Sequence, residues 1–185
     1  TARWGTTTAL TMADGVTTKN VSQMLIGGAG LSVAVGLNAE SADAPGDDFV
    51  GFAANDLRFA LGLFSEVGTP ANTWTTLNGS LGAAVLAGIP GVVLEATGLA
   101  LNYNTASVGQ QVATFAGVHA IAMVVGGQTV TLNNNGALGR LLQAFGHIEV
   151  NVAGFFGVEG DFGIEKATHT LVLADGSSVE ASTLS

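Results

Sequence analysis

Apolar side chains recur at every second position along much of this chain. Between Ile148 and Ile164 the even positions are mostly apolar, whereas the odd positions include Glu149, Glu159 and Asp161. A period of two residues is the repeat of a β-strand whose two faces differ in polarity. The pattern therefore predicts one or two strands with one apolar face and one mainly polar face.

Two other segments show the same alternation with a single slip of phase. Phe49 to Phe64 and Val92 to Tyr103 each lose the alternation at a turn-forming pair, Asn55-Asp56 in the first and Thr97-Gly98 in the second. A slip of this kind predicts a bulge or a bend inside a long strand. We expect further strands at Leu31 to Leu37, Trp74 to Val85, Val112 to Val125 and Gln128 to Leu132.

Helix has few candidates, because 27 of the 185 residues are Gly and an interior Gly costs about 1 kcal/mol relative to Ala in a helix. Ala137 to Phe145 fits best, since its Leu and Phe residues recur at helical spacing and Asn133 to Gly136 precede it as candidate caps. The sequence predicts one short helix there. It predicts loops at Asn38 to Asp48, Glu66 to Asn72, Gly88 to Gly91 and Asn104 to Gln110.

Strands joined by Asp-Gly turns favour antiparallel neighbours. The sequence therefore predicts an all-β fold, an elongated and mostly antiparallel sandwich or open barrel with long strands. The alternative is a β-solenoid, which would need a regular rung of about 20 to 30 residues.

A short segment near the start of the chain resembles one near its end. Thr8 to Gly15 reads TALTMADG and His169 to Gly176 reads HTLVLADG, so that Ala13 and Ala174 lie 161 residues apart. Because any β-rich protein contains several such hairpins, a chance match is the alternative. Tandem repetition predicts that residues 1–24 are the tail of a preceding unit and residues 25–185 one β-rich unit, with a period of about 161 residues.

Composition excludes several classes of protein. The chain has 14 acidic and 5 basic residues, a net charge of −9, and we therefore expect no nucleic-acid partner. Mean hydropathy is +0.48 and charged residues make up 10%, which excludes ordinary disorder. The longest apolar stretch, Met24 to Val35, is shorter than the roughly 20 residues of a membrane-spanning helix, so we expect no membrane span.

Residues that carry catalysis are sparse. The chain has no Cys, which excludes disulfides, zinc–thiolate sites and thiol nucleophiles. Its three histidines, His119, His147 and His169, lack the spacing that places two imidazoles on one metal ion. We therefore predict no catalytic residue, no cofactor-binding residue and no enzymatic activity.

One loop carries several carboxylates. Glu40, Asp43, Asp47 and Asp48 are candidate calcium ligands, because Ca²⁺ takes oxygen ligands from flexible loops. The order of ligands in an EF-hand loop is absent, and a solvated acidic loop is the alternative. Trp74 lies in a segment typical of a sheet, and only on an exposed face would it offer a ring for sugar stacking.

Several of these segments together resemble a known class of protein. They are Asn55 to Leu63, Thr73 to Leu77, Gly91 to Asn102, Gly154 to Lys166 and Leu173 to Gly176. These runs resemble the long tandem repeats of giant secreted bacterial surface proteins, which are adhesin-like, often exported by type I secretion and often accompanied by calcium-binding Gly-rich repeats. The resemblance covers roughly Phe49 to Val179. The nonapeptide calcium repeat is absent from this chain, so calcium does not follow from the resemblance.

The resemblance implies a structural repeat of an extracellular bacterial fibre or adhesin, secreted or held at the cell surface. Its expected partners are adjacent repeats or other copies of the same protein, joined head to tail. The alternative is a carbohydrate- or surface-binding β module that uses Trp74 or the acidic loop and takes a surface glycan as partner.

Overall fold

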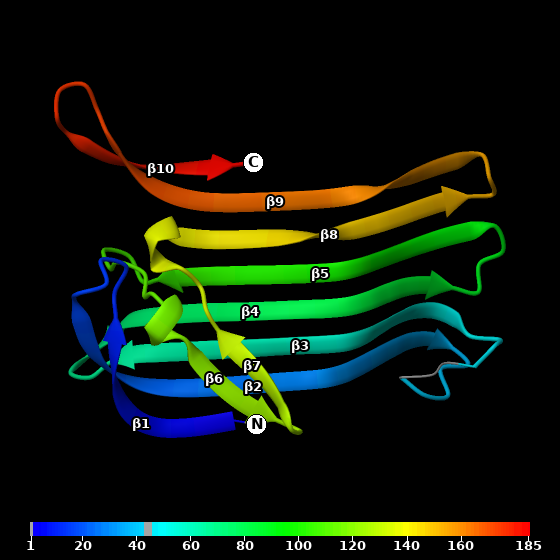
Figure 1. Ribbon diagram of the computed structural model, residues 1–185, viewed down its shortest axis with the longest axis horizontal. Coiled ribbons are helices and arrows are strands. Elements are labelled where there is room, and N and C mark those ends of the chain that lie inside the picture. Colours follow the sequence, from blue (N-terminus) through cyan, green and yellow to red (C-terminus); the bar gives the residue numbers. More distant parts are fainter. Residues whose placement is uncertain (1, 43–45) are drawn as a thin grey trace.

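A computed structural model of the chain describes residues 2–42 and 46–185, and these residues form an all-β fold (Figure 1). Two 3-10 helices of one turn each are the only helices in the described ranges, and neither could cross a membrane. The elements are β1 (Ala2–Thr11), β2 (Thr18–Leu37), β3 (Val50–Glu66), β4 (Thr69–Ala87), β5 (Val92–Ala106), η1 (Gly117–His119), β6 (Ile121–Val125), β7 (Gln128–Leu132), η2 (Gly136–Leu138), β8 (Arg140–Val152), β9 (Phe156–Val172) and β10 (Ser178–Leu184).

Eight of the strands form one antiparallel sheet in the order β1-β2-β3-β4-β5-β8-β9-β10, and β6 and β7 form a separate two-stranded hairpin. Strand order follows chain order, so the first and last strands lie at opposite edges of the sheet (Figure 1). The prediction of an all-β fold with long antiparallel strands is confirmed. The sheet stays open across the described residues, and the solenoid alternative is wrong because successive strands pair side by side in one layer.

The predicted helix at Ala137 to Phe145 is wrong. A single 3-10 turn forms at Gly136–Leu138, where the Asn135 side chain accepts a hydrogen bond from the backbone N–H of Ala137 at 3.0 Å. Gly139 then adopts a φ of 70°, which ends the turn, and strand β8 begins at the next residue. Backbone pairing of β8 with β5 and β9 overrides the helical spacing of its apolar residues.

Most predicted strands and loops are confirmed, with changes at their boundaries. Gln128 to Leu132 coincides with β7, and Leu31 to Leu37 and Trp74 to Val85 lie within β2 and β4. The prediction for Val112 to Val125 is wrong in its first part, because β6 begins only at Ile121. The preceding segment instead bonds through its backbone to the end of β1 and to the loop after β7.

The two predicted bulges are confirmed. Asp56 has a φ of 56° and Gly98 a φ of 59°, and the pairing of β5 with β8 shifts between Thr97 and Ala100. Strand β2 shifts its register at the same level, next to Gly30 with a φ of 60°. The long strands bend about midway along their length (Figure 1).

The β6–β7 hairpin packs over one half of the sheet, against β2, β3 and β4, and forms the core with it. The covered half consists of the strand segments between the bend and the end of the sheet that holds the turns at residues 13–16 and 174–176. The segments beyond the bend are the open half, which comprises residues 31–37, 50–57, 80–87, 92–98, 146–152 and 156–163. The hairpin face is the side of the sheet that carries β6–β7, and the bare face is the other side.

Side-chain size allows the hairpin to approach the sheet closely. A Cβ at Gly62 would lie 2.7 Å from the Phe64 ring and 2.8 Å from Leu132 of β7, so a larger residue there would force these buried side chains to shift. Trp74 is 1% exposed and donates its indole N–H to the carbonyl of Gln111 at 2.8 Å. The covered half therefore contains a closely packed core, which also includes Leu10, Met12, Val21, Leu25, Ala60, Phe64, Ala106, Val112, Ala113, Phe115 and Val130.

Candidate functional site

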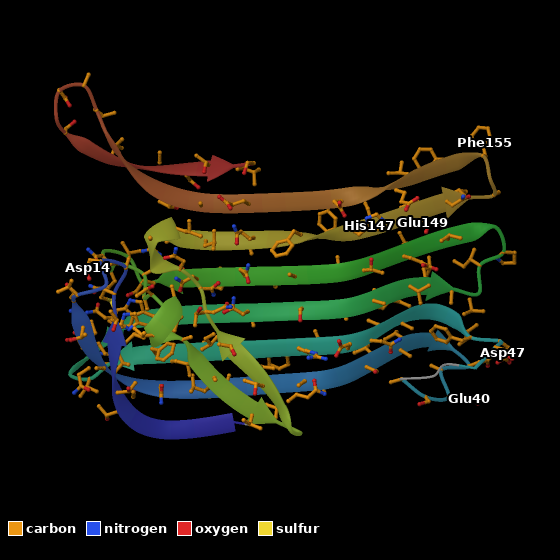
Figure 2. All side chains as sticks on the ribbon, viewed as in Figure 1. Asp14, Glu40, Asp47, His147, Glu149 and Phe155 are labelled. Carbon is orange, nitrogen blue, oxygen red and sulfur yellow. The ribbon has the colours of Figure 1, made fainter. Side chains whose placement is uncertain are left out.

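The acidic loop lies at the tip of the open half. Figure 2 shows Glu40 and Asp47 there, at the end of the molecule opposite Asp14. Both carboxylates are exposed, as is Asp48. A Cβ at Gly46 would lie 3.4 Å from Asp48 Oδ1 and 3.9 Å from Glu40 Oε2, so these two side chains approach the same point.

Asp43, the fourth predicted calcium ligand, lies outside the described residues. The Asn38 side chain donates hydrogen bonds to the backbone carbonyl and to Oδ2 of Asp48, both at 3.1 Å. In the part of the chain that the structure describes, no group of three or more His, Asp or Glu side chains is placed to hold a metal ion. Calcium binding by this loop stays a prediction.

Trp74 does not offer an exposed ring. Its side chain lies in the same core cluster as Val112, Ala113 and Phe115, and its indole N–H is already bonded. The exposure that sugar stacking on this residue would require is therefore not present.

The two Ala-Asp-Gly segments form closely similar turns. In the first turn, Asp14 Oδ1 accepts hydrogen bonds from the backbone N–H groups of Val16 and Thr17 at 2.9 and 2.8 Å, and Oδ2 accepts one from the Thr17 hydroxyl at 2.6 Å. Gly15 has a φ of 72° and donates its N–H to the carbonyl of Met12. The hydrogen bond from the Thr17 hydroxyl is the main cause that lowers the pKa of Asp14.

The second turn repeats this arrangement. Asp175 Oδ1 accepts the backbone N–H of Ser177 at 2.9 Å and its hydroxyl at 2.6 Å, and the hydroxyl bond is the main cause that lowers the pKa of Asp175. Gly176 has a φ of 82° and donates to the carbonyl of Leu173. The second turn is one residue shorter than the first. The sequence match therefore extends to the Asp side chain that accepts hydrogen bonds within each turn and to the positive φ of the Gly that follows it.

These turns join the edge strands to their neighbours, one at each edge of the sheet. Strand β1 pairs only with Thr18 to Ile26 of β2, and β10 pairs with Lys166 to Val172 of β9. Glu165 and Ser185 also exchange backbone hydrogen bonds. Alternate residues of an antiparallel strand direct their N–H and C=O groups to the same side, so the other odd-numbered residues of β9 direct theirs as Glu165 does. At positions 157 to 163 these backbone groups point away from β8, and no described strand pairs with them.

The bare face carries rows of apolar residues that run across the sheet. Residues directly opposite one another on neighbouring strands point to the same face. One row in the open half runs across six strands through Val35, Phe52, Leu86, Leu94, Val150 and Val158. A row in the covered half runs through Gly28, Phe59, Gly79, Leu101, Ala144 and Ile164.

Both rows lie on one face because of the bulges. Strands β8 and β9 keep one register throughout, so alternation places Ala144 and Val150 on the same side of the sheet. In β5 the apolar positions change from even to odd at Gly98, and the bulge there compensates for the change. An apolar hollow of about 570 Å³ spans the bend, and its lining includes Phe59, Leu77, Leu99, Leu101, Ala144 and Phe162.

The hairpin face of the open half is acidic. Glu95, Glu149 and Glu159 lie directly opposite one another on β5, β8 and β9. In the next row His147 Nδ1 lies 3.0 Å from Asp161 Oδ1, and its Nε2 lies 3.5 Å from Glu159 Oε1. The hydrogen bond to Asp161 is the main cause that raises the pKa of His147. Figure 2 shows His147 and Glu149 on this part of β8.

Sequence reasoning missed the extent of both surfaces. The odd-numbered carboxylates of residues 148–164 signalled a polar face, but Glu95 joins them only through the pairing of β5 with β8. His147 looked isolated in the sequence, and the register of β8 with β9 brings Asp161 to it. Comparison with protein-family models, with curated proteins and with solved structures finds no match for this chain.

Proposed function

We propose that this chain is a structural repeat of an extracellular bacterial fibre or adhesin and that its copies assemble head to tail through the edges of the sheet. The observation that carries the proposal is the pair of matching Asp-Gly turns, one at each edge of a sheet whose strand order follows the chain. The bacterial and extracellular setting rests on the resemblance of Phe49 to Val179 to repeats of secreted surface proteins.

The repeat explains the arrangement of the edge strands. With a period near 161 residues, the strand after the Asp175-Gly176 turn corresponds to β2, and the strand before the Asp14-Gly15 turn corresponds to the end of β9. Strands β9 and β2 have similar lengths, 17 and 20 residues, so a complete β2 of the next unit would pair along the whole of β9. Successive units would then extend one sheet at right angles to its strands.

Unpaired strand edges favour this assembly. An edge presents a row of unsatisfied N–H and C=O groups that template pairing with another strand. The open-half segments of β2 and β9 are such edges at opposite sides of the molecule. An interface between unlike edges is heterologous, and it forms open filaments when the rotation between copies does not close.

The test is a measurement of mass and shape over a range of concentrations, by light scattering and small-angle X-ray scattering. We expect oligomers beyond the dimer that lengthen as concentration rises. Ser182→Pro is the edge variant, because the pairing of Glu165 with Ser185 turns the Ser182 N–H outward, and Pro removes that donor while keeping the inner ladder. Ser182→Ala keeps the donor and is the control.

We expect Ser182→Pro to shorten the oligomers and Ser182→Ala to leave them unchanged. A compact monomer at every concentration would overturn the proposal. That result would favour a discrete carbohydrate- or surface-binding module, with the acidic loop as its remaining candidate site.

A further inference from the structure

We propose that the bare face is an interface at which two copies of this chain pack face to face, as the two layers of a β-sandwich. A sheet with one apolar face buries that face against a second layer in stable folds. The hairpin supplies such a layer only to the hairpin face of the covered half. The bare-face row from Val35 to Val158 has no covering layer among the described residues, and Phe52 in that row is 45% exposed.

The size of the face fits a second copy. Six strands about 4.8 Å apart, with about 15 residues each at about 3.3 Å per residue, give about 1,200 Å² on each copy. Two copies would bury about 2,400 Å² together, which exceeds the roughly 1,600 Å² of a standard interface. A monomer rarely exposes a contiguous apolar patch of more than a few hundred Å². A flat partner of the same dimensions is needed, and the same face of a second copy has those dimensions.

The distribution of charge also favours a second copy. A net charge of −9 opposes self-association unless the carboxylates lie away from the contact. Glu95, Glu149 and Glu159 lie on the hairpin face, which would form the outside of the sandwich. On the described part of the bare face the charged residues in the rows are the basic Arg140 and Lys166, on β8 and β9. The described bare-face rows from β2 to β9 carry no carboxylate, and such an apolar face is complementary to itself under a two-fold axis.

This inference goes beyond head-to-tail assembly and stands on different residues. Edge pairing uses backbone groups of β1, β2, β9 and β10 and continues from copy to copy. Face pairing uses side chains in the middle of the sheet, and it stops at two copies because the bare faces of both copies are then covered. Each can therefore fail while the other holds.

The test compares two Lys substitutions on adjacent residues of β5. Leu94 points to the bare face and Val93 to the hairpin face, and they are similarly exposed, at 41% and 36%. Leu94→Lys places an unpaired charge inside the proposed interface, and Val93→Lys places the same charge outside it. By sedimentation equilibrium we expect Leu94→Lys to raise the dissociation constant of the dimer about 100-fold, whereas Val93→Lys leaves it unchanged.

If Leu94→Lys does not fold, a second variant in the same row, Val35→Lys, tests the same interface. Val35→Lys lies in the same row on β2, where the side chain is 66% exposed, and its far-ultraviolet circular dichroism should match that of the unsubstituted chain. We expect it to weaken the dimer as well. Ser182→Pro, which blocks an edge, should still form two-copy sandwiches.

Three results would overturn the inference. One is a chain that stays monomeric across the concentration range. Another is a dimer that folded Val35→Lys and Val93→Lys leave equally strong. The third is a monomer that floats with phosphatidylcholine vesicles in a sucrose gradient and loses this binding in Val35→Lys, since that would assign the face to lipid.

Discussion

The two halves of the sheet share six long strands and differ in what covers them. On β3, Phe64 faces the hairpin, is 3% exposed and has its ring centroid 5.6 Å from that of Phe115. Twelve residues earlier on the same strand, Phe52 faces the bare side and remains 45% exposed. The comparison shows that strand length and apolar content do not make a core by themselves; a second layer does.

Polar side chains differ between the halves in the same way. In the covered half Asn134 is buried, and its side-chain amide donates to the Thr76 hydroxyl at 2.7 Å and to the Tyr103 carbonyl at 2.9 Å. These bonds tie the end of the hairpin to β4 and β5. In the open half carboxylates lie opposite one another on β5, β8 and β9, and Glu95 and Glu159 among them are exposed. Like charges directly opposite one another on neighbouring strands are destabilising, so these carboxylates do not stabilise the open half.

The largest effect should come from truncating the same residue type in each half. Phe64→Ala removes a buried ring and should lower the free energy of unfolding by about 3 to 5 kcal/mol. Phe52→Ala should cost about 1 kcal/mol or less in the dilute monomer, because its ring already contacts water. Urea unfolding of both variants measures the difference. Equal losses would show that the open half is covered even in the monomer.

A smaller effect is expected at the bulge that keeps the apolar side of β5 on the bare face. Gly98 has a φ of 59°, and a Cβ there would meet no atom within 4 Å. Gly98→Ala therefore costs only backbone strain, about 1 to 2 kcal/mol. Gly160 on β9 is equally open but has no positive φ, so Gly160→Ala should leave stability unchanged or slightly raised. The urea midpoints of both variants check this, and a matching loss at both positions would contradict it.

The alternation of apolar and polar residues predicted most of the strands, because a sheet with one apolar face keeps that two-residue period in its sequence. The slips of phase at Asn55-Asp56 and Thr97-Gly98 correctly located two bulges. The segment Ala137 to Phe145 was misjudged, because Leu141 and Leu142 are adjacent residues that point to opposite faces of β8, and the sequence alone does not separate that arrangement from helical spacing.

The candidate surfaces were less predictable than the strands. The matching turns were found from sequence because their Asp and Gly residues are local signals. The rows of the bare face and the carboxylates opposite one another depend on register between strands far apart in the chain, such as β5 with β8. Register is fixed by pairing and turn geometry, which a single sequence specifies only indirectly.

The smallest effect should be a pH dependence confined to the open half. The hydrogen bond to Asp161, with the nearby charges of Asp161 and Glu159, raises the pKa of His147 above its ordinary value of 6.5. A raised pKa in the folded state means that the charged imidazole stabilises the fold. Its contribution is complete below pH 6.5 and is lost as the pH rises through the folded pKa.

The urea midpoint should therefore fall slightly on going from about pH 6 to about pH 8, and amide exchange in β8 and β9 should become faster. His147→Gln should remove this part of the pH dependence. Asp161→Asn should reduce it, because the largest cause of the raised pKa is lost while Glu159 remains. Since the covered half contains no part of this cluster, its exchange rates, corrected for the intrinsic effect of pH, should respond less than those of β8 and β9. An unchanged pH dependence in His147→Gln would show that the cluster of His147, Glu159 and Asp161 does not stabilise the open half.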